Sequence, residues 1–237
     1  MSIVELPSPN YNHRNAPIDI LLLHYTGMQS AQAALDRLCD PAAKVSAHYV
    51  VDEDGTTYRL VGEEFRAWHA GAAYWAGTKD INAHAIGIEI VNPGHEFGYR
   101  AFPVRQMEAV LTLAKEIVDR HGIAPARVLG HSDVAPLRKE DPGELFDWHY
   151  LAENGVGLWP QLKPCAWSDA EFLLKLGAYG YDLEGSKGTE AAKARHAAVM
   201  AFSRHFRPAR LASLPDPELK AVLNGLIALA SAGASAG

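Results

Sequence analysis

The chain has 237 residues, of which 48% are hydrophobic and 21% are charged, and its formal net charge at pH 7 is −6. These values are ordinary for a soluble globular protein, so we expect one large domain, or one domain with a small second one. No block of Lys or Arg accompanies the negative charge. This argues against nucleic acid as a partner, because phosphate binding needs a basic surface.

The N-terminal segment indicates in which cellular compartment the protein is found. Residues 1–7 lack the charged and apolar regions of a secretory signal. The longest apolar run near this end is too short to cross a bilayer, so we predict no membrane span. These features predict a cytoplasmic protein, with a periplasmic location as the alternative if a leader has been removed. The sequence leaves the oligomeric state open.

Strands and helices alternate through the first two thirds of the chain. In chain order, the pattern predicts a buried strand at residues 18–24, a helix at 30–39, a β-hairpin at 48–60, a buried strand at 85–91, a helix at 103–121 and a short strand at 127–129. The signals are apolar runs for the strands, Ser30 as a helix cap, an Asp-Gly turn in the hairpin, and Gly122 after an apolar stripe of helical period. This alternation predicts an α/β fold with a mixed central β-sheet flanked by helices.

The last third of the chain is helical in pattern. Ser168 begins a capping box, and Asp216 and Pro217 have the form of a cap and a first helical residue. We predict helices at 168–177, 189–205 and 217–230. The organisation expected for the whole chain is a first domain at 1–155, a linker at 156–167, a small three-helix domain at 168–230 and a frayed tail at 231–237.

The segment at residues 130–143 carries the strongest chemical signal. Pro and Gly punctuate it, so it is predicted to be a fixed loop rather than a helix, and it holds both His131 and Asp141. A second histidine, His24, ends the first buried strand. Each of these residues alone fits a local hydrogen bond or the start of a turn. Together they favour a metal site, because two histidines and an aspartate can supply three zinc ligands and leave a fourth position open, which is the layout of a catalytic zinc.

Two charged residues are candidates for catalysis. Glu89 interrupts an otherwise apolar strand, where a carboxylate is costly unless it is paired or used. A salt bridge is one interpretation. The other is a general base with a pKa raised by burial, which accepts a proton from a zinc-bound water. Lys139 is either a solvated surface charge or an ammonium group that stabilises the oxyanion of a tetrahedral intermediate.

Four further residues are weaker candidates for contact with a substrate. His69 and Trp68 lie together in the AWHAG segment, where the histidine either contacts substrate or packs against the tryptophan. Asn82 is a candidate for the same cleft. Asp133 either orients a ligand histidine or caps the turn that follows it.

Seven short motifs in series carry a family resemblance. They are LLHYT at residues 22–26, SAHYV at 46–50, RAWHAG at 66–71, IGIEI at 86–90, GHSDVAP at 130–136, KEDPG at 139–143 and LFDW at 145–148. Over roughly residues 15 to 150 the chain resembles the zinc-dependent N-acetylmuramoyl-L-alanine amidases of the amidase-2 type. An aspartate at position 141, where some relatives have cysteine, fits the AmpD and AmiD branch. His84 departs from the serine of many members.

The resemblance implies a role for each matching residue. His24, His131 and Asp141 match the zinc ligands, Glu89 matches the catalytic glutamate, and Lys139 matches the lysine that stabilises the oxyanion. Residues 173–207 also resemble a small peptidoglycan-binding domain of three helices. That domain would either steer cell-wall fragments or brace the catalytic domain.

The function expected from this resemblance is hydrolysis of an amide bond in peptidoglycan. The bond joins N-acetylmuramic acid, or its 1,6-anhydro form, to L-Ala of a stem peptide, and the partners are muropeptides or murein. The alternative is a non-catalytic peptidoglycan sensor of the same fold. The preference between anhydro-muropeptides and intact murein stays open.

Overall fold

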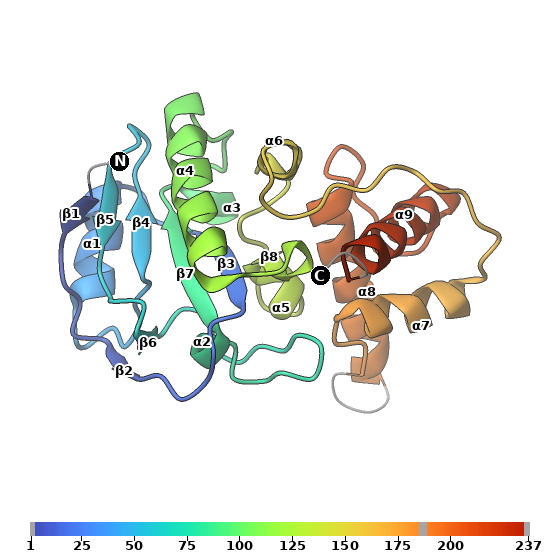
Figure 1. The fold of residues 1–237 in the computed structure, drawn as a ribbon, viewed down its shortest axis with the longest axis horizontal. Coiled ribbons are helices and arrows are strands. Elements are labelled where there is room, and N and C mark those ends of the chain that lie inside the picture. The colour runs from blue at the N-terminus through green and yellow to red at the C-terminus, as the bar shows by residue number, and fades with distance from the viewer. Residues whose placement is uncertain (1–2, 185–188, 235–237) are drawn as a thin grey trace.

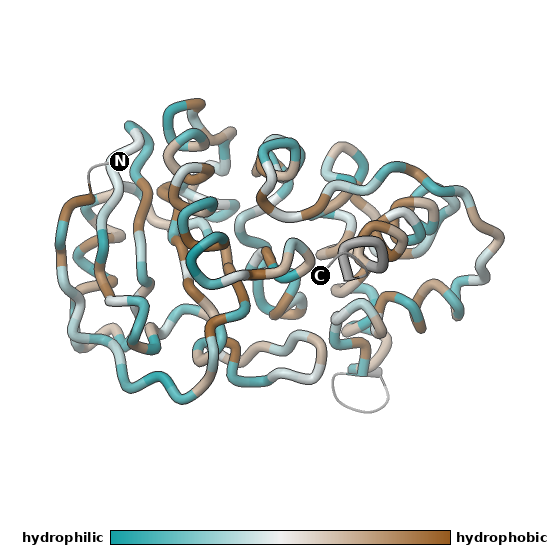
Figure 2. The backbone as a smooth tube through the Cα atoms, viewed as in Figure 1, coloured by the Kyte–Doolittle hydropathy of each residue, from teal (hydrophilic) through white to brown (hydrophobic). Residues whose placement is uncertain are grey.

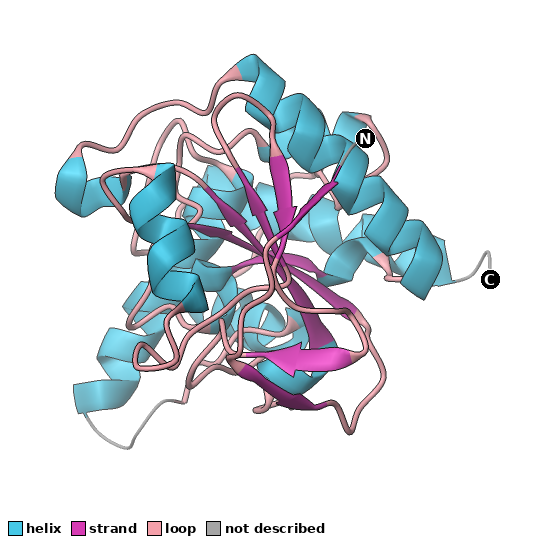
Figure 3. Cartoon of the chain, turned by 90° about the vertical axis from the view of Figure 1, so that its left-hand side faces the viewer, coloured by secondary structure: helices cyan, strands magenta, loops and turns pink. Residues whose placement is uncertain are grey.

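The computed structural model describes residues 3–184 and 189–234. A central β-sheet has helices on both of its faces, as Figures 1 and 3 show, and the C-terminal helices pack beside its β8 end. This arrangement confirms the predicted α/β fold with a mixed, helix-flanked sheet. Among the described helices, none combines the length and apolar character needed to cross a membrane.

The main sheet has six strands in the order β1-β5-β4-β7-β3-β8. Their bounds are β1 (Ile3–Glu5), β3 (Ile20–Tyr25), β4 (Tyr49–Val51), β5 (Thr57–Arg59), β7 (Ala85–Ile90) and β8 (Val128–Gly130). The predicted hairpin is the antiparallel pair β4–β5, and the other neighbours in this sheet are parallel. A second sheet pairs β2 (Tyr11–His13) with β6 (Phe65–Ala67) in antiparallel fashion.

The longer helices match the predictions closely. The described helices are α1 (Ala31–Cys39), α2 (Ile81–His84), α3 (Gly94–Phe97), α4 (Val104–His121), η1 (Pro125–Arg127), α5 (His131–Val134), α6 (Trp148–Glu153), α7 (Asp169–Tyr179), α8 (Thr189–Phe206) and α9 (Pro217–Ala234). The Ser30 hydroxyl accepts the N–H of Ala33 and caps α1. Gly122 ends α4 with φ of 63°, a conformation that glycine adopts without strain.

Two expectations about the chain's local structure were wrong. Residues 131–134, predicted as loop, form the short helix α5, which is too short to show a helical period in the sequence. The last helix continues to Ala234, so residues 231–234 are helical rather than frayed. The rest of the predicted tail, residues 235–237, lies outside the described part of the chain. Residues 156–167 contain neither helix nor strand.

The C-terminal helices share a hydrophobic core with the sheet. Side chains alternate along β3, so Ile20 and Leu22 pack into one cluster and Leu21 and Leu23 into another against α4. All four are fully buried, as is usual for a central parallel strand. The first cluster continues into α7, α8 and α9. Figure 2 shows hydrophobic residues along the central strands.

Phe202 of α8 tests the contribution of this shared core, since its side chain is 0% exposed within the first cluster. We expect Phe202→Ala to lower the free energy of unfolding by about 3–5 kcal/mol, because it removes buried apolar surface and leaves a cavity. Chemical denaturation would measure this change. Leu174→Ala, at a position that is 75% exposed, is the control and is expected to change stability little. Equal effects of the two substitutions would contradict the shared core.

Candidate metal centre and active site

The register of three parallel strands brings the candidate residues together. In the β3–β7 pair, His24 lies opposite Glu89. In the β3–β8 pair, Leu23 lies opposite Gly130, so His131 follows at the same edge as His24. The carboxyl ends of parallel strands meet at one edge of a sheet, which is where ligand sites form in open α/β folds.

Three side-chain atoms converge on one point at this edge. His24 Nδ1 lies 2.9 Å from His131 Nδ1 and 3.1 Å from Asp141 Oδ2, and His131 Nδ1 lies 3.0 Å from Asp141 Oδ2. All three residues are buried. Zinc ligands at bond lengths of about 2.0–2.1 Å in tetrahedral geometry lie about 3.3 Å apart. The donor set therefore fits a metal ion in both type and spacing.

Local contacts fix this donor set. His131 Nε2 lies 3.0 Å from the carbonyl oxygen of Ala70, and a hydrogen bond donated there leaves Nδ1 free to bind a metal. The backbone N–H of Ser132 donates to the carbonyl of Asp141 at 2.9 Å. Gly130 permits this approach, because a Cβ there would lie 2.8 Å from Cδ of Pro142.

The protonation states also suit metal binding. Burial, followed by the neighbouring His131, lowers the pKa of His24 to about 4, so this imidazole is neutral at pH 7. Burial raises the pKa of the Asp141 carboxyl, but the attraction of His131 and the hydrogen bonds from His131 and His24 outweigh it, so this pKa lies below its usual value. A neutral imidazole and an ionised carboxylate are the forms that coordinate a metal.

His69 lies directly behind the first ligand. Its Nδ1 is 3.0 Å from His24 Nε2, and the two rings meet edge to face. Its ring occupies the space that a side chain at Gly87 would fill, since a Cβ there would lie 2.6 Å from His69 Nδ1. Asn82 Oδ1 accepts the backbone N–H groups of His69 and Ala70 and fixes this turn. His69 therefore orients His24 as well as lining the pocket.

Glu89 lies at the pocket as a partly buried residue. Its Oε2 is buried and has no hydrogen-bond partner within residues 3–184 and 189–234. Burial, followed by repulsion from Asp141, raises the pKa of Glu89 well above its usual value, while Lys139 acts in the opposite direction. A carboxyl group of this kind is suited to accept a proton and return it during a reaction.

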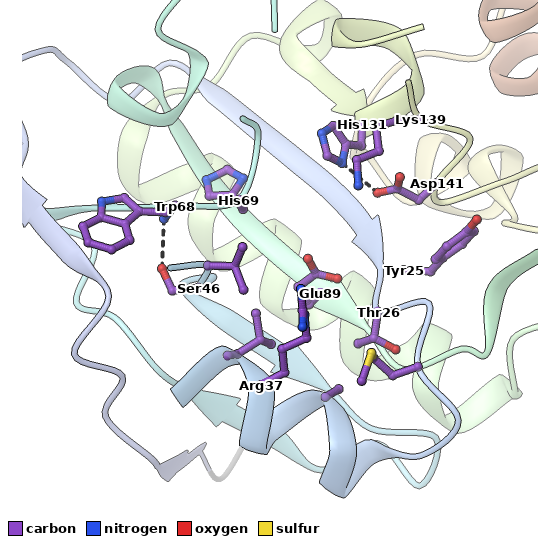
Figure 4. A pocket seen from close by; sticks show the side chains of 14 residues that line it. Tyr25, Thr26, Arg37, Ser46, Trp68, His69, Glu89, His131, Lys139 and Asp141 are labelled. Carbon is purple, nitrogen blue, oxygen red and sulfur yellow. Dashed lines mark hydrogen bonds and ion pairs between the residues drawn. The ribbon is translucent and has the colours of Figure 1, made fainter. Parts of the chain in front are cut away.

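The pocket in front of these residues has a volume of about 180 Å³ (Figure 4). Of the predicted residues, it is lined by Trp68, His69, Glu89, His131, Lys139 and Asp141. Trp68 forms part of one wall, where its indole N–H donates to Asn12 at 2.9 Å. Asn82 and Asp133 are buried and do not line this pocket.

Several lining residues were missed by the sequence analysis. They are Tyr25, Thr26, Met28, Arg37 and Ser46, with apolar residues of α1 and Val45. Arg37 is exposed on α1 and extends toward Glu89 in Figure 4. Nothing in the sequence distinguishes it, because helical periodicity reveals the buried stripe of α1 and leaves the other positions unranked.

Known proteins share this fold and sequence. Residues 14–144 match the family model described as N-acetylmuramoyl-L-alanine amidase. The chain is 35% identical over 233 residues to the N-acetylmuramoyl-L-alanine amidase AmiD of Escherichia coli, covering 89% of this chain and 82% of AmiD. It is 31% identical to the 1,6-anhydro-N-acetylmuramyl-L-alanine amidase AmpD of Haemophilus influenzae, over 62% of this chain and 90% of AmpD.

Solved structures agree with the sequence matches. A complex of E. coli AmiD with the substrate anhydro-N-acetylmuramic acid-L-Ala-D-gamma-Glu-L-Lys superposes with a TM-score of 0.79 and 32% identity, covering 92% of each chain. A crystal structure of AmpDh3 from Pseudomonas aeruginosa has a TM-score of 0.79 and 31% identity, covering 94% of each chain.

Fold, site and comparisons together define the class of protein: this is an amidase, an enzyme that hydrolyses amide bonds. Within that class, the chain belongs to the N-acetylmuramoyl-L-alanine amidase family. The resemblance noted in the sequence is thereby confirmed.

The pKa of Glu89 predicts how the stability of the metal-free protein depends on pH. Because this pKa is higher in the folded than in the unfolded chain, the proton on Glu89 stabilises the fold at low pH, and this contribution is lost as pH rises from about 4.5 through the folded pKa. We therefore expect Glu89→Gln to become progressively more stable than wild type as pH rises. Denaturation of both metal-free proteins across pH measures this difference, and parallel curves would contradict it.

Proposed function

We propose that this amidase is zinc-dependent and cleaves the amide bond between N-acetylmuramic acid, or its 1,6-anhydro form, and L-Ala of peptidoglycan stem peptides, in cell-wall recycling or turnover. The muropeptide bound by AmiD supports the substrate class. The observation that carries the proposal is the Oε2 of Glu89, which has no partner in the described part of the chain and lies at the pocket that Asp141 and His131 also line. The cytoplasmic location stays a prediction from the sequence.

His24, His131 and Asp141 would hold the zinc ion through Nδ1, Nδ1 and Oδ2. When bound, zinc acidifies a water and polarises a carbonyl oxygen. The two imidazoles and one carboxylate supply a single negative charge, and this ligand set leaves a coordination position free. His69 holds the ring of His24 in place during the reaction.

Glu89 would act as the proton carrier. Its Oε2 accepts a proton from the attacking water, and the same oxygen returns the proton to the nitrogen of the departing L-Ala. Lys139 lines the same pocket, so its ammonium group stabilises the negative oxygen that forms at the carbonyl carbon. The non-catalytic sensor has no specific observation in its favour, because two of the three proposed ligands, the proposed base and the proposed cation line one pocket.

The direct test is hydrolysis of an anhydro-muramyl tripeptide beside intact sacculi, monitored by mass spectrometry, with chelator treatment followed by zinc addition. We expect zinc-dependent release of the free tripeptide, and the ratio between substrates separates recycling from wall turnover.

Glu89→Ala should keep stoichiometric zinc and lose about 10²–10⁴-fold in turnover, because it removes the base and leaves the ligands. Asp141→Ala should lose zinc. Zinc-loaded wild type that cleaves neither substrate would overturn the proposal.

Arg37 is proposed to contact the stem peptide. A γ-linked glutamate, as in the ligand of the AmiD complex, keeps a free α-carboxylate one residue beyond L-Ala. An exposed guanidinium at the pocket matches that charge. We expect Arg37→Ala to raise KM about threefold to fivefold, since an ion pair in an open pocket contributes up to about 1 kcal/mol.

An amidated substrate provides the control for Arg37. With the α-carboxylate replaced by a carboxamide, wild type and Arg37→Ala should have the same KM. Steady-state kinetics on the two substrates measures the coupling. A KM change of equal size on both substrates would mean that Arg37 acts on the shape of the pocket and not on the carboxylate.

A further inference from the structure

A buried carboxylate close to the proposed ligand His131 forms hydrogen bonds with the C-terminal helical region. Asp133 is 0% exposed, and its Oδ2 accepts the backbone N–H of Gly130 at 2.8 Å. The same oxygen lies 2.7 Å from Nδ1 of His205 in α8, and Oδ1 accepts the hydroxyl of Tyr181 at 2.6 Å. The carboxylate of Asp133 therefore links the segment that carries His131 to His205 of α8.

The His205 ring is fixed in turn by aromatic neighbours. It stacks on Trp148 with ring centroids 3.8 Å apart and on Phe206 at 3.9 Å. Trp148 also closes over the end of β8, where a Cβ at Gly130 would lie 3.2 Å from the indole ring. His205 is only 4% exposed on its side chain. Its Nδ1 thus faces Asp133 with little freedom to turn away.

The residue before His205 on α8 contacts the segment that carries Asp141. Arg204, which is 7% exposed, donates from Nε to Glu144 at 3.3 Å, and its Nη2 lies 3.6 Å from Glu140. These carboxylates flank Asp141 in the chain. His95 Nε2 lies 3.2 Å from Glu144 on the far side, so the loop is held between α8 and α3.

We propose that His205 and Arg204 of α8 are positioning residues for amide hydrolysis, which hold the His131 and Asp141 segments at the spacing that the metal requires. This inference rests on the proposed zinc site. The physical reason is that His131 lies on a four-residue helix and Asp141 on a loop, so the contacts from α8 add to the local hydrogen bonds that hold these two ligands. Groups that contact the ligands of a metal, without binding the metal themselves, set the geometry of those ligands and the affinity for the metal.

The test compares zinc affinity, cobalt absorption spectra, kcat and KM in four full-length variants. His205→Ala removes the donor to Asp133, and His205→Asn restores a donor near the position of Nδ1. Arg204→Met keeps the aliphatic part and removes the charge. His196→Ala is the matched control, because His196 is an exposed histidine on the same helix.

We expect His205→Ala to weaken zinc binding about 10–100-fold, to change the d–d spectrum of bound cobalt and to lower kcat with KM unchanged. Arg204→Met should change the same properties in the same direction, while His205→Asn and His196→Ala should resemble wild type. Chelator competition measures the affinity.

The outcomes distinguish failure of the positioning role from failure of the proposed function. If His205→Ala and Arg204→Met fold and retain wild-type zinc affinity, cobalt spectrum and kcat, the positioning role is wrong and the proposed function stands. If His205→Ala does not fold, Arg204→Met decides by the same measurements. Wild-type protein that binds neither zinc nor cobalt overturns both proposals.

Discussion

The parallel register of β7, β3 and β8 is the constraint on which the site depends. It places His24 beside Glu89 and directs β8 to deliver His131 at the same edge. A slip of one residue would turn every side chain of β3 to the opposite face of the sheet. Residues 20–23 are packed alternately into two different clusters, so a slip would disrupt the packing on both faces of the sheet. The hydrophobic core thus determines which polar atoms meet.

Two carboxylates at this edge have opposite environments, which separates their chemical roles. Asp141 is held by two imidazoles, which keep its carboxyl ionised. Glu89 has a buried oxygen without a partner in the described structure and a raised pKa. Neighbouring groups with pKa values moved apart are the usual sign of distinct catalytic assignments. Ligand and base are therefore distinguished by their surroundings, although both are simple acidic residues.

The sequence predicted most of the sheet, the long helices and the residues that line the centre of the pocket. These signals are local: apolar periodicity, caps, and motifs in which the chemistry lies close in sequence. The three-residue strands β1, β2 and β6 were missed because they show no measurable alternation. The partners of Asp133 were missed for another reason. Tyr181 and His205 lie 48 and 72 residues away, and no local pattern reports such a pairing.

The core that β3 shares with α7, α8 and α9 has a consequence for how this enzyme can be divided. A cut within residues 156–167 would uncover an apolar face over Trp75 and Val134 and remove two hydrogen-bond partners from Asp133. Exposed surfaces of this kind promote association and precipitation. A shorter enzyme built on the same sheet therefore needs other side chains at those positions. The C-terminal helices of this chain are therefore part of its core and not a separable unit.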